Sequence, residues 1–140
     1  MKTSSILIVE DETPQMEDLK RRARQAGFGF VHACLSEADA IAAWDREGGF
    51  NALLLDLNLG SNENEGYRLL RYLRSHRNSP ERVFIRSVHL KVKMFSLEAV
   101  ALHRITFYFK DEDEHESRLD QDLQEFAANC GSDGRLAVSP

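Results

Sequence analysis

Four polar positions in this chain could share one piece of chemistry, because each lies at the end of a short apolar run. They are Glu10-Asp11-Glu12, Asp56, Ser87 and Lys110. Carboxylates that are brought together repel one another, and burying them costs free energy unless a positive group compensates. Mg²⁺ is a hard cation that prefers oxygen ligands and keeps several waters. The four positions therefore predict an acidic metal site with a lysine beside it.

Within such a site, Asp11 and Asp56 are the expected direct ligands of Mg²⁺. Glu10 is expected to act directly or through a water, and the backbone carbonyl of Asn58 could complete the protein ligands. Oxygen ligands on one side and a lysine on the other suit a reaction that gathers negative charge on oxygen atoms.

Phosphoryl transfer to a carboxylate is a reaction of this kind, since it depends on positioning and charge neutralisation. We expect Asp56 to be the nucleophile that accepts the phosphoryl group. Lys110 would neutralise the incoming oxygens together with the metal ion, and Ser87 would donate a hydrogen bond to one of them. Each residue alone has a simpler explanation as a cap, a turn or a surface charge. The ordered combination favours a functional site.

The elements that must position these residues alternate along the chain. Strands are predicted over 6–9, 30–35, 52–57, 83–88 and 106–109. Helices are predicted from Thr13 to Gly27, from the Ser36 cap to Gly48, around residues 67–73, and over 94–103 and 116–130. This alternation predicts a parallel sheet with helices on both faces, in which sites form beyond the carboxyl ends of the strands.

Composition narrows the class of protein. The 140 residues fit one domain, expected over 1–130 with a short, mobile C-terminal tail over 131–140. The formal charge is −5 and no basic stripe indicates nucleic-acid binding. The apolar runs are too short to span a membrane or to form a secretory signal. Cys34 and Cys130 lie far apart without a thiol-activating pattern, as expected of a reduced, cytoplasmic protein.

These residues together resemble the receiver domain of two-component response regulators, over about residues 4–130. The resemblance is carried by the segments 6–12 and 53–57, by Gly66, and by Ser87 and Lys110. It implies a flavodoxin-like three-layer α/β/α sandwich whose five parallel strands lie in the order 2-1-3-4-5. It implies a stand-alone receiver, similar to the chemotaxis response regulators, rather than an enzyme acting on a separate substrate.

The resemblance also implies partners and a switch. Asp56 would receive its phosphoryl group from a histidine kinase or a phosphotransfer protein, in a Mg²⁺-dependent self-catalysed transfer that is later reversed by hydrolysis. Ser87 would move toward the phosphoryl group, and Phe107 would change rotamer. The face built from the fourth helix, the fifth strand and the fifth helix would then contact a downstream protein, or a second copy of the chain in a homodimer.

Three residues depart from the usual pattern of the family. Asp111 follows Lys110 where proline is usual, Gly60 replaces a common proline, and Arg86 stands where an apolar residue is usual. Arg86 is expected to point into the rim, to pair with an acid, or to mark an unusual register of its strand. These departures motivate a second hypothesis, an unphosphorylated pseudo-receiver that works as a scaffold. A third is a phosphatase of the haloacid-dehalogenase type, although Asn58 stands where that class needs a second acid.

Overall fold

Five strands form a single parallel sheet in the order β2-β1-β3-β4-β5. The computed structural model describes residues 4–56, 65–74, 79–87, 104–110 and 112–136, apart from the side chains of 65–68, 74 and 131–136. The strands are β1 (Ser5–Val9), β2 (Phe30–Cys34), β3 (Ala52–Asp56), β4 (Arg82–Ser87) and β5 (Thr106–Phe109). The predicted strands and their order are confirmed.

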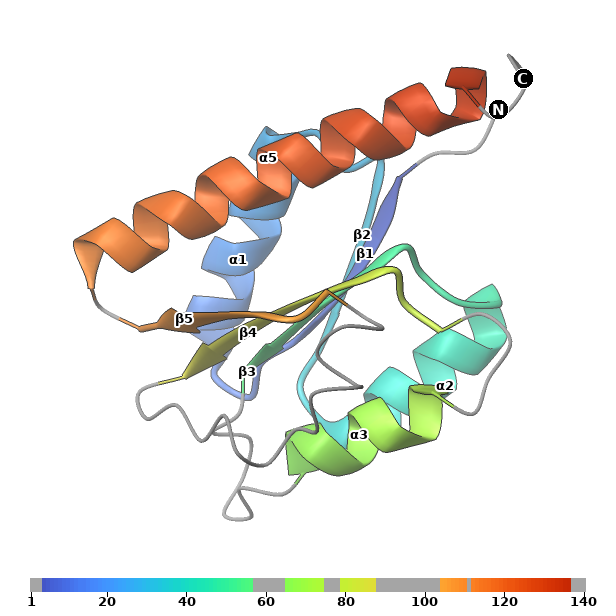
Figure 1. The fold of residues 1–140 in the computed structure, drawn as a ribbon. Coiled ribbons are helices and arrows are strands. Elements are labelled where there is room, and N and C mark those ends of the chain that lie inside the picture. The colour runs from blue at the N-terminus through green and yellow to red at the C-terminus, as the bar shows by residue number, and fades with distance from the viewer. Residues whose placement is uncertain (1–3, 57–64, 75–78, 88–103, 111, 137–140) are drawn as a thin grey trace.

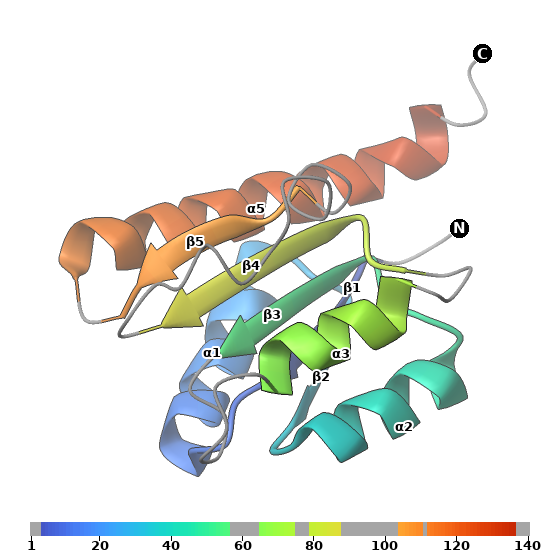
Figure 2. The same ribbon diagram turned by 60° about the horizontal axis from the view of Figure 1, so that its bottom comes forward.

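Helices cover both faces of the sheet, as the predicted three-layer sandwich requires. Helices α1 (Thr13–Ala26) and α5 (Asp113–Leu136) lie on one face, and α2 (Glu37–Glu47) and α3 (Glu65–Arg74) lie on the other (Figure 1). Figure 2 shows the strands fanned out between the two helical layers, with β2 and β5 at the edges. The fold class predicted from the alternating elements is therefore confirmed.

The ends of the first two helices lie where capping residues predict them. Pro14 occupies the first turn of α1, and Gly27 closes that helix with a φ of 112°, a left-handed conformation that glycine adopts without strain. Ser36 caps α2 by accepting a hydrogen bond from the backbone N–H of Asp39 at 3.1 Å, and Gly48 ends it. Local sequence thus sets these boundaries.

The last helix is longer than its sequence pattern predicts. Helix α5 begins at Asp113 instead of residue 116, and it continues to Leu136, into the expected tail. Its first turn contains acidic residues, which favour a helix N-terminus. Glycine inside a helix costs about 1 kcal/mol, so Gly131 weakens the helix without having to end it. The predicted fourth helix, over 94–103, lies outside the described residues.

Alternation along the strands divides the core into two clusters. In β1, β3, β4 and β5 the even-numbered residues face α1 and α5 and the odd-numbered ones face α2 and α3, whereas in β2 this parity is reversed. The first cluster includes Ile8, Leu54 and Phe84, and the second includes Val9, Leu55 and Ile85. All five residues of β3 are buried. A strand that is covered on both faces must be almost wholly apolar, so the buried Asp56 at its end is an exception that requires a partner.

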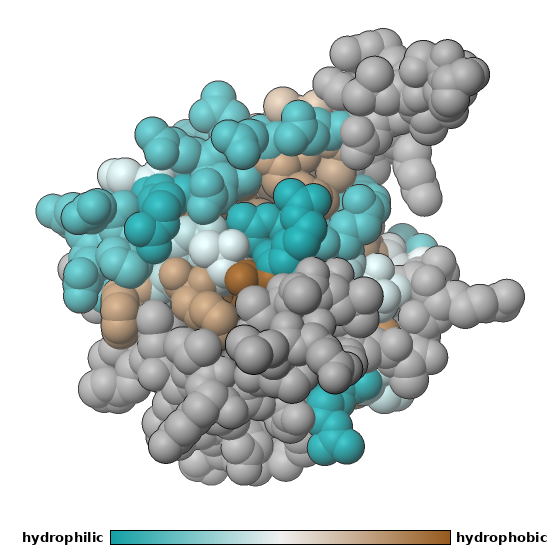
Figure 3. All heavy atoms as spheres, viewed as in Figure 1, coloured by the Kyte–Doolittle hydropathy of each residue, from teal (hydrophilic) through white to brown (hydrophobic). Residues whose placement is uncertain are grey.

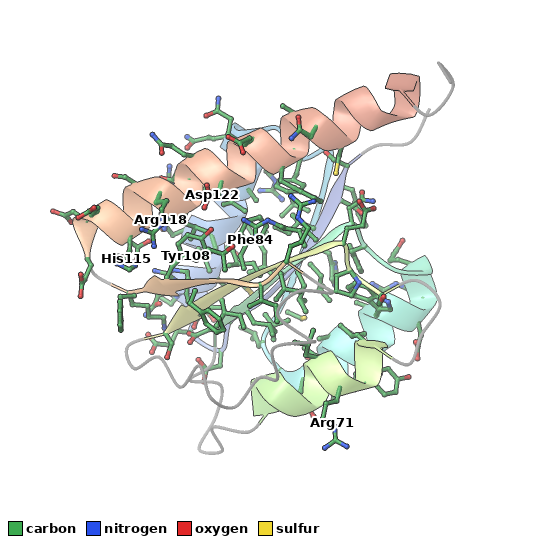
Figure 4. All side chains as sticks on the ribbon, viewed as in Figure 1. Arg71, Phe84, Tyr108, His115, Arg118 and Asp122 are labelled. Atoms are coloured by element: carbon green, nitrogen blue, oxygen red, sulfur yellow. The ribbon has the colours of Figure 1, made fainter. Side chains whose placement is uncertain are left out.

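The layer between β5 and α5 also contains a buried polar contact. The Tyr108 hydroxyl donates a hydrogen bond to Oδ2 of Asp122 at 2.5 Å. The guanidinium of Arg118 lies 5.5 Å from the centre of the tyrosine ring (Figure 4). Burial and the neighbouring carboxylate raise the pKa of Tyr108, which keeps the hydroxyl protonated as a donor. This contact anchors α5 on the edge strand.

The outer side of α5 is mainly hydrophilic in the view of Figure 3. Among the described residues, no helix has both the length and the apolar character needed to cross a membrane.

Candidate functional site

Three carboxylates gather at the carboxyl ends of β1 and β3. Glu10, Asp11 and Asp56 each place one oxygen within 4.8 Å of the other two. Glu10 is fully buried and Asp56 is 2% exposed, whereas Asp11 is open to solvent. The predicted convergence of these residues on one rim is found, and one of the three acids is accessible from outside.

Lys110 lies on the other side of this acidic group. Its Nζ lies 2.5 Å from Oδ2 of Asp56 and 3.8 Å from Oε1 of Glu10. The lysine directly follows β5, and its backbone N–H donates to the carbonyl of Ser87 at 3.0 Å. Because this bond continues the pairing of β4 with β5, the sheet itself directs the ammonium group toward Asp56.

Glu10 has an unusual electrostatic environment. Burial raises its pKa from 4.5 to about 8, assisted by a hydrogen bond that its protonated form shares with Asp56 and by the charge of Asp56. The N–H of Glu12, which donates to Oε2 of Glu10 at 3.1 Å, and the charge of Lys110 act in the opposite direction. A perturbed carboxyl at a strand end is typical of a functional site.

Ser87 and Phe107 belong to the opposite sheet face by strand alternation. Ser87 is fully buried at the end of β4. Phe107 is half-buried against the cluster between the sheet and helices α2 and α3, and in the β4–β5 register it pairs with Ile85. Both residues therefore lie on neighbouring strands near the site. The expected ligand Asn58 and the unusual residues Gly60 and Asp111 lie outside the described residues.

Arg86 turns out to pair with acids, one of the three possibilities that the sequence left open. Its Nη2 lies 2.9 Å from Oε2 of Glu116, and its Nη1 lies 3.9 Å from Oε1 of Glu10. The strand register is regular, with Asp56 opposite Arg86. The sequence did not single out Glu116 as the partner. The signal in the sequence that could have helped to find this partner is strand alternation, because it places Arg86 on the same face of the sheet as Asp56.

The donor set fits a hard divalent cation. All three clustered groups offer carboxylate oxygens, the ligands that Mg²⁺ prefers. Oε1 of Glu10 is buried and accepts no hydrogen bond from the described residues. A buried oxygen without a donor is costly, and a cation would satisfy it.

Solved structures with the same fold come from several organisms. A CheY-like receiver domain from Methylobacillus flagellatus is 24% identical, with a TM-score of 0.63 over 87% of this chain and 99% of that one. A CheY-like receiver domain from Methanospirillum hungatei JF-1 is 22% identical, with a TM-score of 0.65 over 89% of this chain and 96% of that one. The signal receiver domain of a DNA-binding response regulator from Colwellia psychrerythraea 34H is 18% identical, with a TM-score of 0.71 over 89% and 98%. At these identities the likeness establishes the fold.

No curated protein matches this chain. The family of response regulator receiver domains matches residues 6–119, which is most of the chain and includes both the acidic cluster and Lys110. Receiver domains serve signalling, and in the family an aspartate accepts the phosphoryl group. The chain belongs to the response regulator receiver domain family.

Proposed function

We propose that this protein is the phosphoacceptor of a two-component phosphorelay, with Asp56 as the residue that is phosphorylated. One observation carries the proposal: the buried carboxylate of Asp56 faces the Lys110 ammonium at 2.5 Å and has Glu10 and Asp11 within 4.8 Å. Cationic and metal-binding groups thus surround a single strand-end nucleophile.

In the proposed transfer, a carboxylate oxygen of Asp56 forms a bond to phosphorus, and the bond from phosphorus to the donor's leaving atom breaks. The ammonium of Lys110 pairs with the Asp56 carboxylate before the transfer and with the incoming phosphoryl oxygens during it. Ser87 donates a hydrogen bond to one of these oxygens. Glu10, Asp11 and Asp56 would hold Mg²⁺, with the Asn58 carbonyl as a further expected ligand. When bound, the ion supplies charge neutralisation for the phosphoryl oxygens.

We propose a histidine kinase or a phosphotransfer protein as the donor and a cytoplasmic location, as is general for receivers. The output would be a protein contact through β5, α5 and the predicted helix over 94–103, either with a downstream protein or within a homodimer, and without direct binding to nucleic acid. Ser87 and Phe107 would form the switch, and their common sheet face supports this role. Phosphorylation would bias two pre-existing arrangements of that face.

The decisive test is intact mass after incubation with a small phosphodonor and Mg²⁺. We expect the gain of one phosphoryl group, lost in Asp56→Asn and in EDTA. Asp45→Asn is the matched control, because Asp45 is an exposed aspartate on α2 that accepts a hydrogen bond from Tyr72 at 3.3 Å, away from the site. Absence of the adduct in the unaltered protein would contradict the proposal and favour the scaffold hypothesis.

A further inference from the structure

Arg86 is a buried charged residue near the carboxyl end of β4. Its side chain is 8% exposed, and the strand residues on either side of it, Ile85 and Ser87, are fully buried. Strand alternation places it on the same sheet face as Asp56, and α1 and α5 cover that face (Figure 1). Burying a guanidinium is costly unless acids compensate it, so its partners define its role.

Two carboxylates flank the guanidinium, and it is bonded to only one. Nη2 donates to Oε2 of Glu116 at 2.9 Å, whereas Nη1 remains 3.9 Å from Oε1 of Glu10. Within the described residues, neither Nη1 of Arg86 nor Oε1 of Glu10 makes a hydrogen bond. Arg86 is thus anchored to α5, and it faces the metal-binding carboxylate without a formed bond.

The α5 partner is part of a larger ionic network. Glu116 also pairs with Arg22 of α1 at 2.9 Å, and Arg22 pairs with Asp120 at 2.8 Å. Although burial opposes it, the bonds and charges of the two arginines lower the pKa of Glu116, which keeps it ionised. Arg22, Arg86 and Glu116 line a groove of about 740 Å³ between α1 and α5. The network therefore runs from the acidic cluster to an accessible groove.

We infer that the charge of Arg86 makes the affinity of the acidic cluster for a divalent cation depend on the charge of Glu116 in the groove. The inference rests on the proposed metal site. A positive guanidinium beside Glu10 repels an incoming cation, and Glu116 reduces this repulsion by neutralising part of the arginine charge. Such coupling is reciprocal. If a ligand in the groove changes the charge at Glu116 and thereby the affinity for the metal ion, the metal ion must change the affinity for that ligand by the same factor.

Substitutions of Arg86 and of Glu116 should change the affinity for Mg²⁺ in opposite directions. Arg86→Met removes the repelling charge, so we expect tighter binding. Glu116→Gln leaves the charge of Arg86 uncompensated, so we expect weaker binding. Each change is expected to be on the order of tenfold, within the usual range of coupling between neighbouring sites. In the double variant the effect of Glu116→Gln should disappear, because its mediator is gone.

The measurement is calorimetric titration of the full chain with Mg²⁺, with every variant in the same buffer and at the same pH. Arg86→Lys retains the charge and should remain near the unaltered protein. Glu125→Gln is the matched control, because it removes an equal charge from an exposed position on α5. Circular dichroism checks that each variant is folded. If Arg86→Met fails to fold, Glu116→Gln, altered at a half-buried helix position, still decides the question against its control.

The outcomes separate this inference from the proposed function. If the unaltered protein binds no Mg²⁺, the metal site itself is wrong and the inference falls with it. If the unaltered protein binds Mg²⁺ but Glu116→Gln matches Glu125→Gln, only the coupling is overturned. The coupling would also be overturned if Glu116→Gln changed the affinity for Mg²⁺ equally in the unaltered chain and in the Arg86→Met variant. The charge of Glu116 would then act on the metal site without Arg86.

Discussion

The buried carboxyl of Glu10 should make the metal-free protein less stable as pH rises. Its pKa is raised from 4.5 to about 8, chiefly by burial and then by Asp56. Between these values the folded protein holds a proton that the unfolded chain has lost. Stability falls with pH wherever the folded state binds more protons than the unfolded state, so the decrease should lie between about pH 5 and pH 8.

The size of the decrease follows from the shift. At about 1.4 kcal/mol per pKa unit, a change from 4.5 to about 8 corresponds to roughly 5 kcal/mol. Relaxation around a buried charge lowers such values, so we expect a loss of about 2–5 kcal/mol in the free energy of unfolding. Glu116 does not interfere in this window, because its pKa is lowered and its contribution is lost only at more acidic pH.

Urea unfolding in EDTA at pH 5.5, 7 and 8.5 would measure the effect, with the fluorescence of the buried Trp44 as the signal. Glu10→Gln cannot ionise, so it should match the unaltered protein at pH 5.5 and exceed its stability at pH 8.5. Glu17→Gln, at an exposed position on α1, is the control and should follow the unaltered protein at every pH. Equal stability of Glu10→Gln and the unaltered protein at pH 8.5 would refute the reasoning.

Two further substitutions test the site and the fold. Lys110→Met removes the ammonium beside the buried carboxylate of Asp56, and breaking a buried ion pair should lower the free energy of unfolding in EDTA by about 3–5 kcal/mol. Lys20→Met, at a weak surface pair, should change it by less than about 1 kcal/mol, and equal losses would contradict the role of Lys110. Ser36→Ala removes the cap that accepts from the Asp39 N–H and should cost about 1 kcal/mol in urea unfolding, whereas Ser36→Asn should restore most of it.

The strands of the sheet can be predicted from the sequence because each is marked by the pattern of its own residues. Short, mainly apolar segments mark every strand, and the capping residues Pro14, Gly27 and Ser36 mark three helix ends. The order of the strands came from the family resemblance and is confirmed by the register. The predicted end of the last helix at residue 130 is wrong, because Gly131 weakens a helix without having to end it.

The site was predictable to the extent that chain position determines it. Parallel strands bring their carboxyl ends to one edge, so Glu10, Asp56 and Lys110 had to meet there. The partner of Arg86 was not predictable in this way. Whether Arg86 reaches Glu116 depends on how α5 crosses the sheet, and a packing angle between distant segments leaves no local pattern in the sequence.

Because side chains alternate between the two faces of the sheet, an electrostatic response to a change at the site is expected on one face and a packing response on the other. Glu10, Asp56 and Arg86 occupy even positions on the face of α1 and α5, and their contacts are ionic, so a change of charge acts over several ångströms. Ser87 and Phe107 occupy odd positions, and Phe107 packs against the apolar cluster beneath α2 and α3, where a change must act through packing. Charge added at Asp56 would therefore reach the groove through Arg86 and Glu116 without any rearrangement of Phe107. A variant such as Phe107→Ala should impair the packing response while leaving the coupling between Mg²⁺ and Glu116 intact, because Phe107 and Arg86 lie on opposite faces of the sheet.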